Sequence, residues 1–538
     1  MKVPRLGAAQ GRLLRGYGPL VVLIAAFLLM VLLVPTVARE RIFTGNRNDP
    51  GSVIPGIGPG AESTTGGPNG LVSLGTVPGL SATQRLRQVA ACTDRSAQVP
   101  GDPYSPPCIA FGGDNGGSTT RGVTRDTIKI SARHTKDAAL QSVLAEIGGA
   151  KITDSPDELV RTEIRMADYF NAHFQFYGRK LRVVDYPGSG SLTTELTGSG
   201  QDQANADAIR VANEEKSFAD ITAYTPSYAD ALTRQQVMSF GELYFSAPWF
   251  QARHPYGWSY FSDCNSIHQL FADYLNKRVF SRPARWAGGD LAGKPRTIAL
   301  VLPDNPEYAP CLQLSDSMVR AAGNAYTTKL VYDLDIPTLS SQAASMISKL
   351  KSLNVTTVAL ATDPITPVYL TAKAHEQNYF PEWVTPGIGF VNYDLFAQLY
   401  DPAEWAHAFG TTLEGVQVPR RASFGYAAYK SLYPDEPAQL VDAVYNQMYL
   451  LALGIQMAGP DLTPASFERG MVAYPGGSGP GGKWKFGPGL YSPQRDGEAM
   501  WWDANSPSEV WGNTGTWRTD GHRWPLGQAT PGEPRPGP

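Results

Sequence analysis

Short apolar runs alternate with longer helical patterns along this chain from Arg121 onward, and this alternation restricts the fold more than any other feature. Runs of five to eight β-branched and apolar residues are typical of strands, and apolar residues every three or four positions are typical of helices. Strands connected by helices pair in parallel, so the pattern predicts an α/β fold with doubly wound parallel sheets. The expected strands are 127–132, 179–185, 218–224, 297–302, 328–332 and 356–361, and the expected helices begin near residues 155, 203, 227, 265, 311, 339, 368 and 440.

The alternation is interrupted between Phe245 and Tyr260, where aromatic residues and prolines gather, and then it starts again. Two α/β units in succession explain this interruption. The apolar helix expected at Leu440–Met457 belongs to the protein interior, because polar residues interrupt it and it is short for a membrane span. From Gly476 the chain is rich in Gly and Trp, which is typical of strands and turns.

The first expected helix carries start and stop signals. Ser155 can cap it, Pro156 suits its first turn, and Glu158 completes a capping box. Gly178 follows the last apolar position, where a left-handed residue often ends a helix.

An uncharged stretch, Pro19–Ala38, follows an N-terminal segment with four basic residues. Twenty helical residues span about 30 Å, the thickness of the bilayer's hydrocarbon core. The basic flank is expected to stay in the cytoplasm, which places the rest outside. The alternative is a cleaved signal peptide, because the apolar run also suits one. Residues 1–41 are therefore a cytoplasmic tip with a transmembrane anchor or a signal, and we expect either a single-pass cell-membrane protein or an exported one.

Residues 42–121 are rich in Gly and Pro, so we expect a tether that carries a cysteine loop. Outside the cytoplasm four cysteines are expected to form disulfides, and three pairings are possible. We favour Cys92–Cys108, which closes a short Pro-rich loop, and Cys264–Cys311 within the body. The chain has no C-x-x-C pair and no His at ligand spacing, so no metal or cofactor is expected. Residues 526–538 are expected to form a disordered tail.

The charge balance excludes one class of partner. The chain carries 46 basic and 49 acidic residues, a net charge of −3. Without a basic excess to displace counterions from phosphates, a nucleic-acid partner is not expected. The chain also contains no G-x-S-x-G, H-E-x-x-H or P-loop motif, so no catalytic residue is proposed.

Several short segments occur in a familiar order over about residues 122–475. They are Gly122–Ile130, Tyr169–Asn171, Gly178–Leu181, Ile298–Val301 and Leu413–Val416. In this order they resemble the type I periplasmic binding proteins of ABC transporters, in particular the branched-chain amino-acid group. The resemblance implies two α/β lobes joined by a three-crossover hinge that closes on a solute. It implies lobe one at 122–248 plus 419–462, and lobe two at 249–418 plus 463–525.

Ligands of open α/β sheets bind beyond the carboxyl ends of the strands, where loops supply polar groups and helices supply N-terminal amides. In amino-acid-binding relatives the loop after the third strand holds the ligand carboxylate, and Thr225 and Ser227 match that role in kind. The candidate ligand-binding residues are His134, Tyr224, Thr225, Ser227, Ser246, Ala247, Trp249, Asp304, Tyr308 and Asp363.

One segment departs from the family pattern. Relatives that take amino acids place an acidic residue after the fourth strand of lobe two. Here that region is Thr385–Gly389 (TPGIG), which contains no acid. The departure argues against an amino-acid ligand.

The sequence thus favours a non-catalytic, extracytoplasmic solute-binding protein, anchored in the membrane by its N-terminal helix and expected to be a monomer. It would capture a small polar or amphipathic solute and deliver it to ABC permease subunits. A ligand-sensing ectodomain that acts through a partner, or a secreted hydrolase, remains the alternative. The combined substitution of Thr225→Ala and Ser227→Ala is expected to weaken solute binding with little loss of stability.

Overall fold

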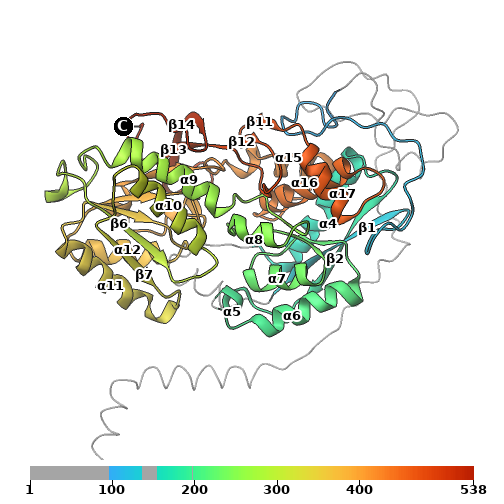
Figure 1. Cartoon of the computed structure of the whole chain (residues 1–538), viewed down its shortest axis with the longest axis horizontal. Coiled ribbons are helices and arrows are strands. Elements are labelled where there is room, and N and C mark those ends of the chain that lie inside the picture. The colour runs from blue at the N-terminus through green and yellow to red at the C-terminus, as the bar shows by residue number, and fades with distance from the viewer. Residues whose placement is uncertain (1–95, 136–153, 197, 538) are drawn as a thin grey trace, which may run out of the picture. The chain divides into compact units, whose positions relative to one another are not determined.

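A computed structural model describes residues 96–135, 154–196 and 198–537. These residues form two large sheets and one two-stranded sheet, in which β11 (Gly477–Gly479) pairs with β12 (Gly482–Trp484). Figure 1 shows the strands of each large sheet with their own helices around them. We call the first sheet with its helices lobe one, and the second sheet with its helices lobe two.

The sheet of lobe one has five parallel strands in the order β2-β1-β3-β4-β5. They are β1 (Thr127–His134), β2 (Lys180–Pro187), β3 (Ala219–Asp220), β4 (Met238–Phe240) and β5 (Gly257–Trp258). The helices are α4 (Pro156–His173), α5 (Leu192–Leu196), α6 (Gln201–Arg210), α7 (Pro226–Arg234), α8 (Ala247–Ala252), α15 (Phe424–Leu432), α16 (Val441–Ala458) and α17 (Pro464–Ala473). The predicted capping box of α4 is confirmed, because Ser155 and Glu158 cap each other's backbone.

The sheet of lobe two has seven strands in the order β14-β13-β10-β9-β8-β6-β7, and β13 runs antiparallel to both of its neighbours. They are β6 (Ile298–Pro303), β7 (Thr328–Tyr332), β8 (Thr357–Leu360), β9 (Glu382–Thr385), β10 (Ala408–Thr412), β13 (Asp496–Pro507) and β14 (Thr514–Pro525). The helices are α9 (Cys264–Tyr274), α10 (Ala309–Ala321), α11 (Ile336–Ser352), α12 (Thr366–Glu376), α13 (Asp394–Ala397) and α14 (Pro402–Trp405). The predicted α/β fold with parallel sheets is therefore confirmed.

Strand β6 explains why the expected strands read as continuous apolar runs. Ala299 and Val301 join one core, while Ile298 and Leu300 join a second core on the other face of the sheet. Helices α11 and α12 lie on one side of β6, and α9 and α10 on the other (Figure 1). A parallel sheet covered on both faces needs apolar residues at every position.

The described chain passes between the two sheets three times. It leaves lobe one after β5, returns after β10 to form α15, α16 and α17 on the core of lobe one, and leaves again before β13. The crossing segments are hydrogen-bonded to one another. The Ser262 backbone N–H donates to Glu414 Oε1 (3.1 Å), and the Ser262 hydroxyl donates to Gln494 Oε1 (3.0 Å).

The lobe boundaries lie later in the chain than the sequence resemblance implied. Strand β5 pairs with β4 of lobe one, although β5 was assigned to lobe two and the boundary after residue 248 divided α8. Helix α17 was also assigned to lobe two, but its Phe467 packs on Phe240 (ring centroids 5.8 Å apart) and Trp258 (5.6 Å) of lobe one. Apolar contact with the first sheet decides both assignments.

Two segments expected to be loose are held against the lobes. Residues 96–121, expected to be part of the tether, are fixed on lobe one, where Tyr104 stacks on Trp484 (4.0 Å) and Asp102 accepts a hydrogen bond from Tyr449 (2.8 Å). Residues 526–537, expected to be disordered, lie on lobe two, where Arg278 donates to the Thr530 carbonyl (2.7 Å). Buried hydrogen bonds and aromatic contacts order both segments.

The disulfide Cys264–Cys311, which connects α9 to α10, is confirmed. The favoured Cys92–Cys108 pairing involves Cys92, which lies outside the described residues, as does the apolar stretch Pro19–Ala38. Among the helices that the structure describes, none has the length and apolarity needed to cross a bilayer.

Candidate ligand-binding site

The polar groups at the carboxyl ends of the strands fall into two kinds. One kind has all its hydrogen bonds inside the protein, and the other has buried atoms without partners. The distinction matters because a buried polar atom that lacks a partner costs about 1–3 kcal/mol, which a bound molecule can recover.

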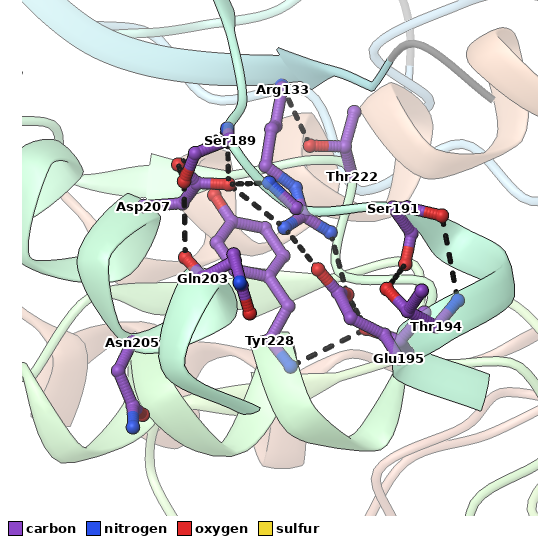
Figure 2. Close-up of polar contacts among 12 residues, drawn as sticks. Arg133, Ser189, Ser191, Thr194, Glu195, Gln203, Asn205, Asp207, Thr222 and Tyr228 are labelled. Atoms are coloured by element: carbon purple, nitrogen blue, oxygen red, sulfur yellow. Dashed lines mark hydrogen bonds and ion pairs between the residues drawn. The ribbon is translucent and has the colours of Figure 1, made fainter. Parts of the chain in front are cut away.

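One group whose charges are paired within the protein surrounds Arg133 at the end of β1, although Arg133 Nε itself has no hydrogen-bond partner among the described residues. Its guanidinium donates to both carboxylate oxygens of Glu195 (2.8 and 2.9 Å) and to Asp207 (3.2 Å), and it lies 3.6 Å from the ring centre of Tyr228. Figure 2 shows Arg133 pointing between the two carboxylates. Burial acts to lower the pKa of Arg133, but the hydrogen bonds to Glu195 raise it on balance. This network fills the edge of lobe one with the protein's own side chains.

Thr225 belongs to the same network. Its hydroxyl donates to Glu195 and accepts from the backbone N–H of Tyr228 (3.4 Å), so it caps α7, and the residue is 0% exposed. Its predicted ligand role is therefore corrected to a structural one. Ser227 and Tyr224 in the same loop are partly exposed, and their hydroxyls make no hydrogen bond within the described part of the chain. Burial raises the pKa of Tyr224.

His134 is also engaged inside lobe one. It lies between Glu163, 3.2 Å from its Nε2, and Asp185, with which its Nδ1 is paired. Burial acts to lower the pKa of His134, but the two carboxylates raise it to about 10. The ring is thus a doubly paired cation of the lobe interior.

The predicted residues of the first crossover support α8. The Ser246 hydroxyl accepts from the Trp249 N–H (3.3 Å), and the Ala247 N–H donates to Asn265 (2.8 Å). The Trp249 ring is buried against Phe245 (4.9 Å) in the core of lobe one. None of the three presents a free polar group.

The three predicted residues of lobe two have three different environments. Asp363 caps α12, because it accepts from the backbone N–H groups of Ile365 (2.7 Å) and Thr366 (2.9 Å). Asp304 is exposed. The Tyr308 hydroxyl reaches lobe one, where it donates to the Leu243 carbonyl (3.3 Å). Only Tyr308 bridges the lobes.

The second kind of group lies at the junction of the lobes. Buried atoms without a hydrogen-bond partner occur here after strands of both sheets: Glu242 Oε2, Tyr244 Oη, Thr362 Oγ1, Asn392 Oδ1 and Glu414 Oε2. Others exist elsewhere in the described residues, for example on Trp286, and in lobe one on Arg133, His134 and Glu163, whose charged groups are paired with one another or with Glu195. This convergence marks the junction as the candidate ligand-binding site.

Aromatic rings from both lobes meet beside these atoms. The Tyr244 ring lies 5.5 Å from Phe261 and 5.5 Å from Phe390, and Phe390 lies 5.3 Å from Tyr393. Tyr244 (φ 62°) and Phe390 (φ 59°) both have left-handed backbones. Such conformations cost about 1–3 kcal/mol in a non-glycine residue and are common at ligand sites. We call Tyr244, Phe261, Phe390, Tyr393 and Glu414 the junction cluster.

Glu414 is a buried acid on the crossing segment after β10. Its Oε1 accepts from the Ser262 backbone N–H, and a hydrogen bond from the Tyr244 hydroxyl to the carboxylate acts to lower its pKa. Burial has the largest effect and raises the pKa of Glu414 to about 7. Burial likewise raises the pKa of Glu242 to about 8. No Lys, Arg or His among the described residues forms an ion pair with either carboxylate.

Backbone geometry explains why the TPGIG loop has glycine at positions 387 and 389. Gly387 (φ 70°) and Gly389 (φ 63°) are left-handed, and a Cβ atom on either would lie 2.6 Å from a backbone carbonyl, of Thr411 or Thr362. The loop therefore packs directly on the ends of β10 and β8. A side chain is excluded at both positions, which explains why the loop carries no acid there.

Sequence reasoning missed Glu242, Tyr244, Phe390 and Glu414. Glu242 and Tyr244 follow β4, a strand of only three residues that was not predicted. Glu414 stood in a segment noted for its family resemblance, but β10 before it was not predicted either. An acid directly after an apolar run and before a glycine was the available signal.

One surface hollow lies away from the junction. It has a volume of about 550 Å³, lies between α6 and α7, and is lined by Gln201, Asn205, Ile209, Ala231, Arg234 and Gln235. None of these residues carries a buried unpartnered atom. It is therefore a weaker candidate for a ligand site.

The two lobes with three crossings between them define the fold of the type I solute-binding proteins of ABC transporters, as predicted. No protein-family model and no curated protein matches the sequence. Among solved structures, the chain is similar to a fatty acid ABC transporter substrate-binding protein from Thermomonospora curvata (14% identity, 78% of this chain and 98% of that one, TM-score 0.53). It is also similar to an ABC-transporter solute-binding protein from R. palustris in complex with 4-hydroxybenzoate (12% identity, 75% and 98%, TM-score 0.52).

Proposed function

We propose that this protein is an extracytoplasmic solute-binding protein that holds a small ligand at the junction of its lobes and delivers it to an ABC importer. The observation that carries the proposal is the convergence of buried, unpartnered polar atoms from both sheets, among them Tyr244 Oη and Thr362 Oγ1. In this fold the carboxyl ends of the strands are where ligands bind. A solute that pairs these atoms would favour the closed arrangement, because it contacts both lobes only there.

The crossing segments form the hinge in this proposal. Ser262, Glu414 and Gln494 come from three different crossings and are hydrogen-bonded together. A solute bound to Glu414 would therefore act directly on the segment about which the lobes move. The Tyr308–Leu243 hydrogen bond lies between the lobes and would form on closure.

Localisation and partners extend the proposal. The apolar stretch Pro19–Ala38 would anchor the protein or export it, with the lobes outside the membrane. ABC permease subunits would then receive the solute. The neighbours with this fold are solute-binding proteins, which supports a non-catalytic role. The hypotheses of a sensing ectodomain or a hydrolase have no specific observation in their favour.

A thermal-shift screen of the full-length chain tests the proposal. The compounds are amino acids, sugars, nucleosides, fatty acids and small aromatic compounds. A ligand at 100 times its Kd stabilises the folded state by about 2.7 kcal/mol, so a true solute raises the Tm. The Tyr244→Phe and Glu414→Gln variants are expected to reduce that shift, while Glu509→Gln, at an exposed acid of lobe two, is the matched control. If no compound shifts the Tm, the proposed function is wrong, and turnover of a binding compound would favour a hydrolase.

A further inference from the structure

We propose that the solute of the junction cluster carries an aromatic ring and a neutral or cationic hydrogen-bond donor that binds Glu414. This inference rests on the proposed function and specifies the class of ligand. Its basis is the chemistry that the junction leaves unpaired.

The rings of the cluster provide the aromatic part of the argument. Phe390 meets Phe261 nearly edge to face (5.6 Å, 87° between planes) and Tyr393 in the same way (5.3 Å, 89°). Phe390 and Tyr393 are partly exposed, so a further aromatic ring can add to them in the same geometry. An aliphatic solute would bury area here but gain none of this directional contact.

The unpaired polar atoms provide the donor part. Asn392 Oδ1 can only accept hydrogen bonds, and the same holds for Glu414 Oε2 when its carboxyl group is ionised. The Thr362 hydroxyl can accept as well as donate. The amide nitrogen of Asn392 is already used, because it donates to the Gly415 carbonyl (3.3 Å). The site therefore lacks donors more than acceptors, and a hydroxyl or ammonium group on the solute supplies them.

The charges around Glu414 argue against an anionic solute. The titratable groups that interact with Glu414 are Tyr244, Tyr260 and Tyr393, and none of them is a cation. A carboxylate on the solute would lie beside a buried carboxylate with no positive charge to offset the repulsion. The preference expected here thus differs from that of the R. palustris neighbour, which was solved in complex with 4-hydroxybenzoate.

Isothermal titration of the full-length chain with four probes tests this. The probes are tyramine (cationic), 4-hydroxybenzyl alcohol (neutral), 4-hydroxybenzoate (anionic) and cyclohexylmethanol (not aromatic). We expect tyramine and 4-hydroxybenzyl alcohol to bind at least about tenfold more tightly than the other two. One factor of ten corresponds to about 1.4 kcal/mol. Binding of 4-hydroxybenzoate or cyclohexylmethanol as tightly as tyramine would overturn the inference.

Glu414→Gln separates the role of the charge from that of the rings. The variant is expected to weaken tyramine and strengthen 4-hydroxybenzoate, so that their affinity ratio falls at least about tenfold, whereas Glu509→Gln leaves the ratio unchanged. An unchanged ratio in a folded Glu414→Gln protein also overturns the inference. If that variant does not fold, the unaltered chain tests the two buried carboxylates together, because acidification from about pH 8.5 to about pH 5.5 protonates both Glu414 and Glu242 and must reduce the ratio.

The two proposals fail in distinguishable ways. If sugars, amino acids or fatty acids raise the Tm and none of the aromatic probes binds, the ligand class is wrong and the solute-binding function stands. If nothing in either set binds, both are wrong.

Discussion

The edge of lobe one around Arg133 and the junction around Tyr244 have similar residue types but differ in how these are satisfied. Around Arg133, every carboxylate has a cationic or hydroxyl partner within the lobe. Around Tyr244, buried atoms such as Thr362 Oγ1 and Asn392 Oδ1 are unpaired, and the buried carboxylates of Glu242 and Glu414 have no cationic partner within the described part of the chain. The comparison teaches that a polar group at a strand end is evidence for binding only when its own fold leaves it unsatisfied. Substitutions in the first region should therefore change stability, and those in the second should change binding.

The largest effect is expected for Arg133→Ala. The substitution leaves Glu195 and Asp207 buried without their cation, which should lower the free energy of unfolding by about 3–5 kcal/mol. Arg125→Ala removes an exposed ion pair with Asp114 and should cost at most about 1 kcal/mol. Urea denaturation of both variants measures the difference. Equal, small losses would contradict the structural role of the Arg133 network.

The next largest effect is a pH dependence of the unfolding free energy that arises from Glu414 at the junction. The pKa of Glu414 is raised from 4.5 to about 7 in the folded protein, so folding favours its protonated form. Stability is therefore highest below about pH 4.5, and it falls as the pH rises from there through about 7, by about 3 kcal/mol in total. Glu414→Gln should remove this part of the pH dependence.

Glu242 acts in the same direction, since its pKa is raised to about 8. Only the difference between the Glu414→Gln variant and the unaltered chain therefore counts, measured as unfolding free energy from about pH 4 to about pH 9. Parallel curves for the two proteins would show that Glu414 is not desolvated.

Two tyrosines give a matched pair across the two regions. The Tyr228 hydroxyl donates to Asp220 (2.9 Å), so Tyr228→Phe should cost about 1.5 kcal/mol. The Tyr244 hydroxyl contacts only Glu414 and the Phe390 backbone among the described residues, so Tyr244→Phe should cost less stability than Tyr228→Phe in the absence of solute and should weaken solute binding. Thermal unfolding with and without solute measures both. A reversal, with Tyr244→Phe the more destabilising, would contradict the distinction.

The smallest effect is expected in the loop after β3. Thr225→Ala removes a helix cap and a hydrogen bond to Glu195 and should cost about 1 kcal/mol, while Thr225→Ser should retain most of the stability. Ser227→Ala should change stability by less than about 0.5 kcal/mol, because its hydroxyl is unpaired in the described structure. This replaces the expectation that the double substitution leaves stability intact, and urea midpoints of the three variants test it.

Much of the fold could be predicted because its strands are buried on both faces. The run TIALVL predicted β6, and TKLVY coincides with β7, since continuous apolar or β-branched residues are required there. The capping box at Ser155 located the start of α4. Strands β3, β4 and β5 have only two or three residues each, so no periodicity could reveal the last two.

The candidate site was harder to predict than the fold. The rule about strand ends pointed to the correct edge, and Tyr308 does bridge the lobes. The rule could not distinguish Thr225, whose hydroxyl is hydrogen-bonded to Glu195 inside lobe one, from Tyr244, whose hydroxyl lies at the junction. That difference depends on residues 30 positions away in the chain, which only the tertiary structure brings together.

Hydrogen–deuterium exchange of the full-length chain, with and without the first solute that raises its Tm, tests the central claim most directly. We expect the solute to slow exchange at Glu242–Tyr244, Gly389–Asn392 and Leu413–Gly415, which lie on both lobes at the junction. Exchange in the Arg133 network, at Ser189–Glu195, should not change beyond the general stabilisation. Protection confined to that network, or to one lobe alone, would contradict a binding site at the junction.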